Sequence, residues 1–182
     1  MTIENGDSPV LDAMTKRFKA YKEMAEKAFG QISDAQLRQA LDENTNSIAV
    51  IVKHMSGNLK SRFTDFLTSD GEKPGRDRDS EFVDDIPDRG VMLAMWEESW
   101  RCLFDAMSPL SDSDLDKTIT IRGEPHSVID ALLRQLAHHS YHTGQIVQLA
   151  RFLAKDRWTV LTIPRGGSTK FNAAMSEKHG KK

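Results

Sequence analysis

The sequence predicts an all-α protein, a four-helix bundle with a small β-hairpin excursion before its last core helix. Two observations indicate this class. Four long segments repeat apolar residues at steps of three and four, which is the period of an amphipathic helix. One short stretch near residue 120 alternates apolar and polar residues, as a strand does. Four amphipathic helices can bury their apolar stripes against one another, so we expect a bundle.

The first long helix is predicted from Pro9 to the residue before Gly30. Ser8 followed by proline is typical of a helix start, and glycine is typical of the position after a helix end. The apolar residues at helical spacing between them are Val10, Met14, Phe18, Tyr21 and Ala25. The segment "SDAQLRQAL" then opens with a capping pattern and predicts a short helix.

The second long helix is predicted over about residues 45–68. Its apolar stripe consists of Ile48, Ile51, Val52, Met55, Leu59, Phe63 and Phe66. Residues 69–80 are polar and include two glycines and a proline, so we expect a loop there.

The third long helix is predicted over residues 86–110. Its inner face consists of Met92, Met95, Trp96, Ser99, Leu103 and Met107. Alternation over residues 118–121 and a turn at Gly123 predict the hairpin, and the fourth long helix covers about residues 126–154. The tail is expected to begin extended and to end in a frayed helical turn.

The length, charge and composition of the chain exclude several classes of function. The sequence shows no internal repeat, so residues 1–182 are expected to form one domain, with about 1–8 and 176–182 flexible. The net charge of −2 argues against a nucleic-acid binder that neutralises phosphates. Apolar runs fall short of the roughly 20 residues of a membrane span. A single cysteine, Cys102, and an acidic N-terminus without a signal-peptide pattern fit a cytoplasmic protein.

Three of the six histidines lie on the fourth long helix, within one stretch of five residues. His138 and His142 are four residues apart and therefore only about 40° apart around the helix axis. Both fall on the apolar face, and such a pair can bind one metal ion at about 2.0 to 2.1 Å. His139 lies about 100° away, at the flank, and is a poor companion. The alternative is that these histidines are hydrogen-bonded core or helix-end residues.

A third ligand must come from another helix, and His54 is the candidate. It shares a strip of small and semi-polar residues with Ser47, Val50, Asn58 and Ser61, although the periodicity would equally allow it to face solvent. The weaker candidates are His126, His179, Glu97 and Glu98. A metalloprotease is disfavoured because His139 replaces the glutamate that its HExxH motif uses as the general base.

Two segments resemble a known superfamily. "HHSYHTGQI" is similar to the H-x-x-x-H-x-G-Q signature on the last core helix of the DinB-like superfamily, and "NSIAVIVKHMSGNL" resembles its second-helix segment with the first metal-binding histidine. "GEKPGRDRDSEF" and "LTIPRGGSTKFN" resemble an uncharacterised branch, filed as a domain of unknown function. The resemblance extends from about residue 10 to 175.

The resemblance implies a bundle of the DinB-like/YfiT-like type, often homodimeric, with a divalent zinc, nickel or iron ion held by three histidines. In this chain they are His54, His138 and His142. The sequence departs from the branch at Gly75, where tryptophan is common. Characterised relatives include thiol S-transferases and thiol-dependent isomerases.

Several functions stay open. The first is a metal-dependent transferase that activates a low-molecular-weight thiol and acts on a small-molecule substrate. Arg134 could hold a carboxylate or be a surface residue, while Gln135 and Gln145 could orient reactants, or Gln145 could hydrogen-bond a ligand histidine. The alternatives are a metal-dependent hydrolase with Glu97, Glu98 or Asp130 as base, and a non-catalytic metal-binding stress-response module. Trp100 and Tyr141 are interpreted as packing residues, and the catalytic residues are unknown.

The metal site itself makes a geometric prediction. A shared ion requires the three imidazoles to lie within about 4 Å of one another.

Overall fold

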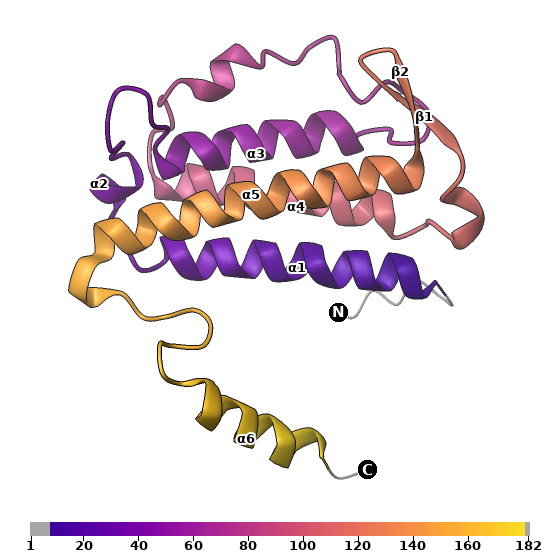
Figure 1. Cartoon of the computed structure of the whole chain (residues 1–182). Coiled ribbons are helices and arrows are strands. Elements are labelled where there is room, and N and C mark those ends of the chain that lie inside the picture. The colour runs from indigo at the N-terminus through magenta and orange to yellow at the C-terminus, as the bar shows by residue number, and fades with distance from the viewer. Residues whose placement is uncertain (1–7, 181–182) are drawn as a thin grey trace.

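The computed structural model describes residues 8–180, and they are mostly helical with one antiparallel hairpin (Figure 1). The helices are α1 (Pro9–Phe29), α2 (Asp34–Leu37), α3 (Ile48–Phe63), α4 (Arg89–Met107), α5 (Val128–Ala154) and α6 (Ser168–His179), with 3-10 turns η1 (Asp79–Phe82), η2 (Asp112–Asp114) and η3 (Lys155–Arg157). The strands are β1 (Thr118–Ile121) and β2 (Glu124–Ser127). The predicted mostly helical class with one hairpin is confirmed. Within residues 8–180, no helix is long and apolar enough to cross a membrane.

Four long helices lie alongside one another. α1 packs mainly against α5, and α3 packs mainly against α4 and also contacts α5. Residues 64–88 run back along α3 before α4 begins, so that α3 and α4 point in the same direction (Figure 1). This long connection covers the side of α3 that the other helices leave open.

The predicted starts of α1 and α2 are correct because their capping residues act as expected, whereas α3, α4 and α5 begin two or three residues later than predicted. The Ser8 hydroxyl accepts a hydrogen bond from the Leu11 amide, and Gly30 follows the last residue of α1. Ser33 and Gln36 form a reciprocal capping box at α2. The second long helix is shorter than predicted. It ends at Phe63 because the next residue is extended and Asp65 has a positive φ of 49°.

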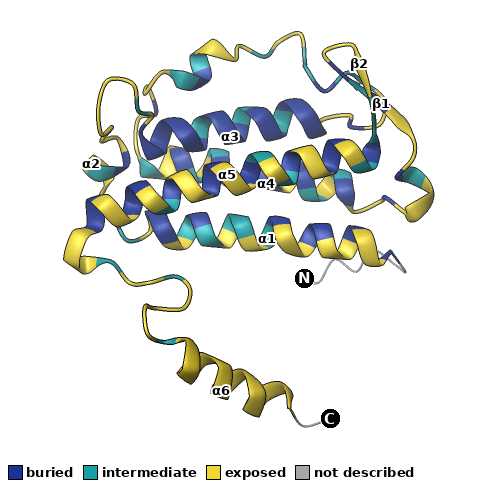
Figure 2. Ribbon diagram, viewed as in Figure 1, coloured by how far each residue is buried: buried dark blue, intermediate teal, exposed yellow. Residues whose placement is uncertain are grey.

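Burial follows the predicted stripes with three corrections, at Val10, Met95 and Tyr21, of which Tyr21 is half-buried. α3 is buried over most of its circumference, whereas α6 is exposed (Figure 2). Val10, predicted to face the core, is 40% exposed because the buried face of α1 begins at Leu11. Met95 is half-buried rather than fully inside. A helix that is buried on nearly all sides can place polar side chains in the interior if they find partners.

The hairpin has a two-residue turn at Arg122 and Gly123, both with positive φ, as predicted for a turn at this glycine. The Asp70 carboxylate accepts hydrogen bonds from both of their amides at 2.8 Å. The Gly71 amide also donates to the Thr120 carbonyl. The loop after α3 is therefore tied to the tip of the hairpin.

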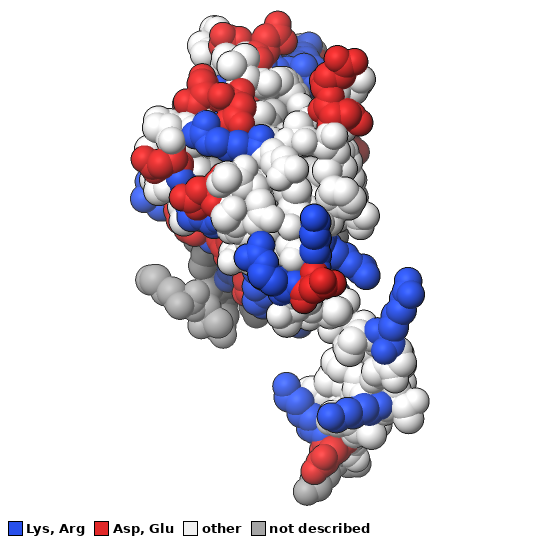
Figure 3. Space-filling model, turned by 90° about the vertical axis from the view of Figure 1, so that its left-hand side faces the viewer, with Lys and Arg blue, Asp and Glu red and all other residues white. Residues whose placement is uncertain are grey.

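The expected frayed turn in the tail is wrong in extent, because α6 is a full helix that ends at His179. None of its residues is buried, and it extends away from the other helices (Figure 1). Ser8, placed in the flexible N-terminal segment, is buried and caps α1, while residues 1–7 and 181–182 lie outside the described residues. Acidic and basic side chains are interspersed on the face in Figure 3.

Candidate metal centre

Three histidines from two helices meet in the interior. His54 lies midway along α3, and His138 and His142 lie on consecutive turns of α5. The Nε2 atom of His138 is 3.3 Å from Nε2 of His54 and 3.2 Å from Nε2 of His142. All three ligand atoms lie within 4.8 Å of one another. The structure therefore brings together the three histidines that the sequence nominated.

The other ring nitrogen of two histidines has a fixed acceptor. His54 Nδ1 donates to Glu81 Oε2 at 2.8 Å, and His142 Nδ1 donates to Gln145 Oε1 at 2.8 Å. In a neutral imidazole, a proton on Nδ1 leaves a lone pair on Nε2. Two lone pairs thus point toward His138 Nε2, which has at most one N–H to offer. A cation among the three nitrogens would accept all the lone pairs.

The separations fit a metal ion. Two ligands at about 2.0 to 2.1 Å from a tetrahedral ion lie about 3.3 Å apart, and the two His138 contacts have this length. The two His138 pairs also meet the expected limit of about 4 Å, while the remaining pair, His54 and His142, lies within the 4.8 Å that encloses the whole set.

The electrostatic environment keeps His138 and His142 neutral. Burial, with smaller contributions from His142 and His54, lowers the pKa of His138 to about 3. Burial likewise lowers the pKa of His142 to about 4, with His54 adding to the effect. Neutral imidazole is the form that binds metal. These two histidines can therefore bind a metal ion at neutral pH without first losing protons.

Glu81 is the residue that sequence reasoning missed. It lies in the 3-10 turn η1, one residue after the predicted polar loop of residues 69–80. Although this connection is irregular, Glu81 is only 5% exposed. Arg76 donates to both of its carboxylate oxygens, at 2.7 and 2.9 Å. Burial raises the pKa of Glu81, but hydrogen bonds from His54 and Arg76 outweigh this and hold it below its usual value. Glu81 is thus a buried carboxylate that orients His54.

His139, which was predicted at the flank of the apolar face, is fully buried. Its ring lies edge-on to Trp100 at 5.0 Å and to Phe18 at 6.2 Å. α5 has two inward sides: one places His138 and His142 toward α3, and the other places His139 against α1 and α4. His139 is outside the three-histidine cluster.

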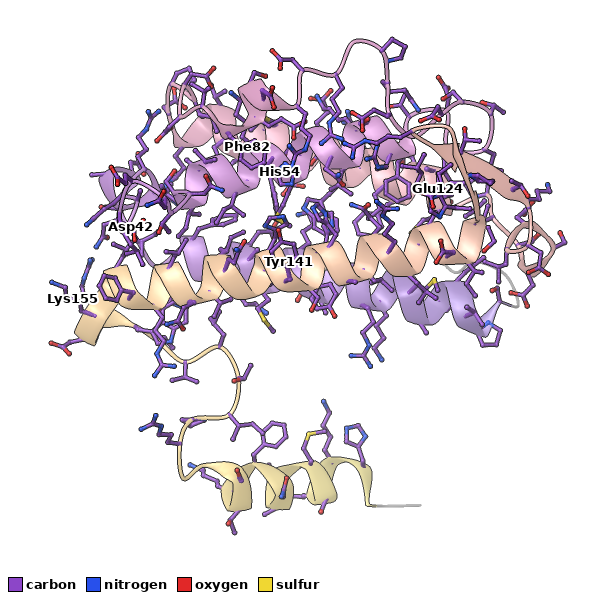
Figure 4. All side chains as sticks on the ribbon, turned by 45° about the horizontal axis from the view of Figure 1, so that its top comes forward. Asp42, His54, Phe82, Glu124, Tyr141 and Lys155 are labelled. Carbon is purple, nitrogen blue, oxygen red and sulfur yellow. The ribbon has the colours of Figure 1, made fainter. Side chains whose placement is uncertain are left out.

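The cluster borders a cavity of about 260 Å³ lined by His54, His138, Gln135, Tyr141 and arginines that include Arg134. Gln135 is buried and donates to Asn58, while Arg134 is exposed. Tyr141, interpreted as a packing residue, is 56% exposed and also lines a second cavity of about 610 Å³ beside Gln145. Figure 4 shows His54 between Phe82, whose ring stacks on it at 4.8 Å, and Tyr141.

The other predicted candidates lie elsewhere. Glu97 and Glu98 are exposed and pair with Lys22 and Lys60. His126 donates to Asp130 on the following turn. His179 lies at the end of the exposed helix α6.

Gly75 lines a separate cavity of about 390 Å³ next to Arg76 and Glu81. No atom lies within 4 Å of the position that a Cβ would take there. The space beside this glycine is therefore open on the outer side of the Glu81 turn.

The comparisons with known proteins identify a family but no activity. The profile of a family described as "protein of unknown function (DUF1572)" matches residues 5–167, which is most of the chain. No curated protein matches the chain.

Proposed function

Since the chain belongs to the DUF1572 family, whose description assigns no activity, we propose a function from the candidate metal centre itself. We propose that His54, His138 and His142 hold a divalent zinc, nickel or iron ion. With this ion, the protein activates a low-molecular-weight thiol for transfer to a small-molecule electrophile.

One observation carries the proposal. The Nε2 atoms of three buried or half-buried histidines converge, while Glu81 and Gln145 fix the tautomers of two of them. Acceptors on Nδ1 are typical of metal-binding histidines, because they orient the ring and make its other nitrogen a stronger donor. A cluster that only filled the core would have no need for two lone pairs aimed at a third imidazole.

A divalent ion bound by three neutral histidines keeps its full charge, which favours a thiolate over a thiol at neutral pH. Residues of the chain would hold the ligand histidines in place and orient the substrate. Glu81 and Gln145 hold the imidazoles in place, and Arg134 lies one turn before His138, where it can orient a substrate. Tyr141 borders two cavities, so that thiol and electrophile could approach from different sides.

The alternatives receive less support. Hydrolysis needs a general base near the ion. The three candidates from the sequence are engaged elsewhere: Glu97 with Lys22, Glu98 with Lys60 and Asp130 with His126. A purely structural site would be expected to have four protein ligands, whereas the cluster within residues 8–180 has three.

The proposal keeps the other expectations from the resemblance. These are a single domain of the DinB-like/YfiT-like four-helix-bundle type, a cytoplasmic location, and a homodimer that binds neither nucleic acid nor membrane. The parallel α3–α4 pair and the long connection between them support the bundle assignment.

The test is a transfer assay on zinc-loaded, nickel-loaded and iron-loaded protein. Each form is mixed with a panel of small thiols and the electrophile 1-chloro-2,4-dinitrobenzene, and the thioether is measured by its absorbance. We expect metal-dependent transfer with at least one thiol, which His138→Ala abolishes and His179→Ala does not change. Metal-loaded protein that transfers no thiol and instead hydrolyses esters would contradict the proposed thiol transfer.

A further inference from the structure

Five arginines line the cavity beside the histidine cluster: Arg62, Arg76, Arg78, Arg122 and Arg134. They come from α3, from the connection after it, from the hairpin turn and from α5. The same cavity is lined by His54 and His138. Positive charge is thus gathered at the candidate metal centre although the chain as a whole has a net charge of −2.

Two carboxylates balance only part of this charge. Glu72 accepts hydrogen bonds from Arg62, Arg76 and Arg122. Glu81 accepts from Arg76 and from His54. Three of the five guanidinium groups therefore share two carboxylates, and the cavity keeps an excess of positive charge.

The arginines divide into a base and a rim. The side chains of Arg62 and Arg76 are only 9% and 6% exposed and are held by the two glutamates. Arg78, Arg122 and Arg134 form the rim and are exposed. Arg122 uses its Nε for Glu72, and its terminal nitrogens have no partner among residues 8–180.

The other two rim arginines also have guanidinium groups without an acidic partner within the described residues. Arg78 lies over the Phe82 ring, 5.0 Å from its centre, and that ring stacks on His54. Arg134 is on the same side of α5 as His138 and Tyr141, at positions i, i+4 and i+7. The rim therefore directs free donors toward the space in front of the histidines.

We propose that this cavity is an anion-binding subsite and that the small-molecule ligand of the metal centre carries a carboxylate or phosphate group held by Arg78, Arg122 and Arg134. Guanidinium groups bind carboxylate and phosphate oxygens with paired hydrogen bonds, and an anion relieves the repulsion among the arginines. This inference deepens the proposed function and rests on it only for the reacting end of the ligand, which would lie at His54 and His138.

The hairpin has a role in this subsite. Asp70 accepts hydrogen bonds from the Arg122 and Gly123 amides and so fixes the turn that presents Arg122. The Gly71–Thr120 backbone bond holds the same turn against the loop. The β excursion thus positions a cationic side chain at the cavity.

Calorimetric titration of the metal-free and the zinc-loaded protein tests the proposal. The probes are succinate and inorganic phosphate, with dimethyl succinate as a neutral match for succinate. We expect at least one anion to bind at least ten times more tightly than the ester, and its affinity to fall as salt rises. Arg78→Gln, Arg122→Gln and Arg134→Gln should each weaken that binding by about tenfold or more, as the loss of a charged hydrogen bond does. Arg151→Gln, an exposed arginine on α5 outside the cavity, is the matched control.

The outcomes separate this inference from the proposed function. If neither anion binds more tightly than the ester, or if the three variants match Arg151→Gln, the subsite is wrong even when the protein binds zinc. If the metal-free protein binds anions through the three arginines but takes up no metal, the subsite is right and the proposed function is wrong. Binding of phosphate alone would assign a phosphate ligand, and binding of succinate alone a carboxylate ligand.

Discussion

At the scale of single residues, the site depends on a carboxylate that faces away from the proposed ion. Glu81 is buried, ionised and bonded to His54 Nδ1 and Arg76. An ionised acceptor raises the donor strength of the imidazole on its far side, and it also prevents the ring from turning. The charge of Glu81 matters as well as its position, since a neutral amide could fill the same space.

Replacing Glu81 by glutamine should therefore weaken metal binding without unfolding the protein. We expect Glu81→Gln to lower zinc affinity by about 10- to 100-fold. The measurement is competition with a chelating dye, together with a circular dichroism spectrum to verify the helices. Glu98→Gln, at an exposed residue of α4, is the control and should bind zinc as the unchanged protein does. An unaltered affinity in Glu81→Gln would show that the Glu81–His54 bond does not support a metal ligand.

The buried histidines also make stability depend on pH. In the unfolded chain His142 titrates near 6.5, whereas burial lowers its pKa to about 4 in the folded protein. Below pH 6.5 the unfolded state binds more protons, so this stability is complete above 6.5 and is lost as the pH falls toward 4. We expect His142 to lower the free energy of unfolding of the metal-free protein, measured in urea, by about 2 kcal/mol between pH 7 and pH 5. His142→Gln should remove that part of the decrease. An equal decrease in this variant would assign the pH dependence to other groups.

At the scale of the elements, the sequence was informative wherever a local rule decides the structure. Ser8, Gly30 and Ser33 mark helix ends through caps, and Gly123 marks the hairpin turn through its positive φ. His138 and His142 could be paired because helical spacing alone places them together. In each case the residues that decide the outcome are neighbours in the chain.

Local rules fail where contacts between distant segments decide. Glu81 lies in an irregular connection, and only the return of that connection along α3 brings it to His54. His139 looked peripheral because periodicity gives a helix one inner face, whereas α5 packs on two sides. The arginine rim combines Arg78, Arg122 and Arg134 from three elements, and no pattern in the sequence links them.

The cap of α3 provides a test at this scale, because α3 places His54. The Ser47 hydroxyl accepts a hydrogen bond from the Val50 amide and is buried. We expect Ser47→Ala to lower the free energy of unfolding by about 1 kcal/mol, measured by urea denaturation. Ser140→Ala, at an exposed position within α5, should change it by less than about 0.5 kcal/mol. A neutral effect of Ser47→Ala would mean that packing alone fixes the start of α3.

At the scale of the whole molecule, the helical core and α6 are distinct parts. None of the α6 residues is buried, whereas Trp158 and Leu161 in the preceding segment pack against the core. The candidate metal centre, the arginine cavity and the hairpin all belong to the part before α6. The chemistry proposed for this protein thus requires only that part.

Removing residues 168–182 should therefore leave both stability and metal content unchanged. We expect the free energy of unfolding to change by less than about 0.5 kcal/mol, because none of the α6 residues is buried. A longer deletion that begins at Trp158 serves as the comparison and should be clearly destabilising. A loss of more than about 2 kcal/mol on removing α6 would show that this helix packs on another surface, such as a second copy of the chain.

The function proposed for this protein depends on the binding of one metal ion by the three histidines. It is tested most directly by elemental analysis of protein that has been offered zinc, nickel and iron and then dialysed. We predict about one ion per chain in the unchanged protein and in His179→Ala, and less than a tenth of that in His54→Ala, His138→Ala and His142→Ala. Equal metal content in all five proteins, or none in the unchanged protein, would contradict the claim.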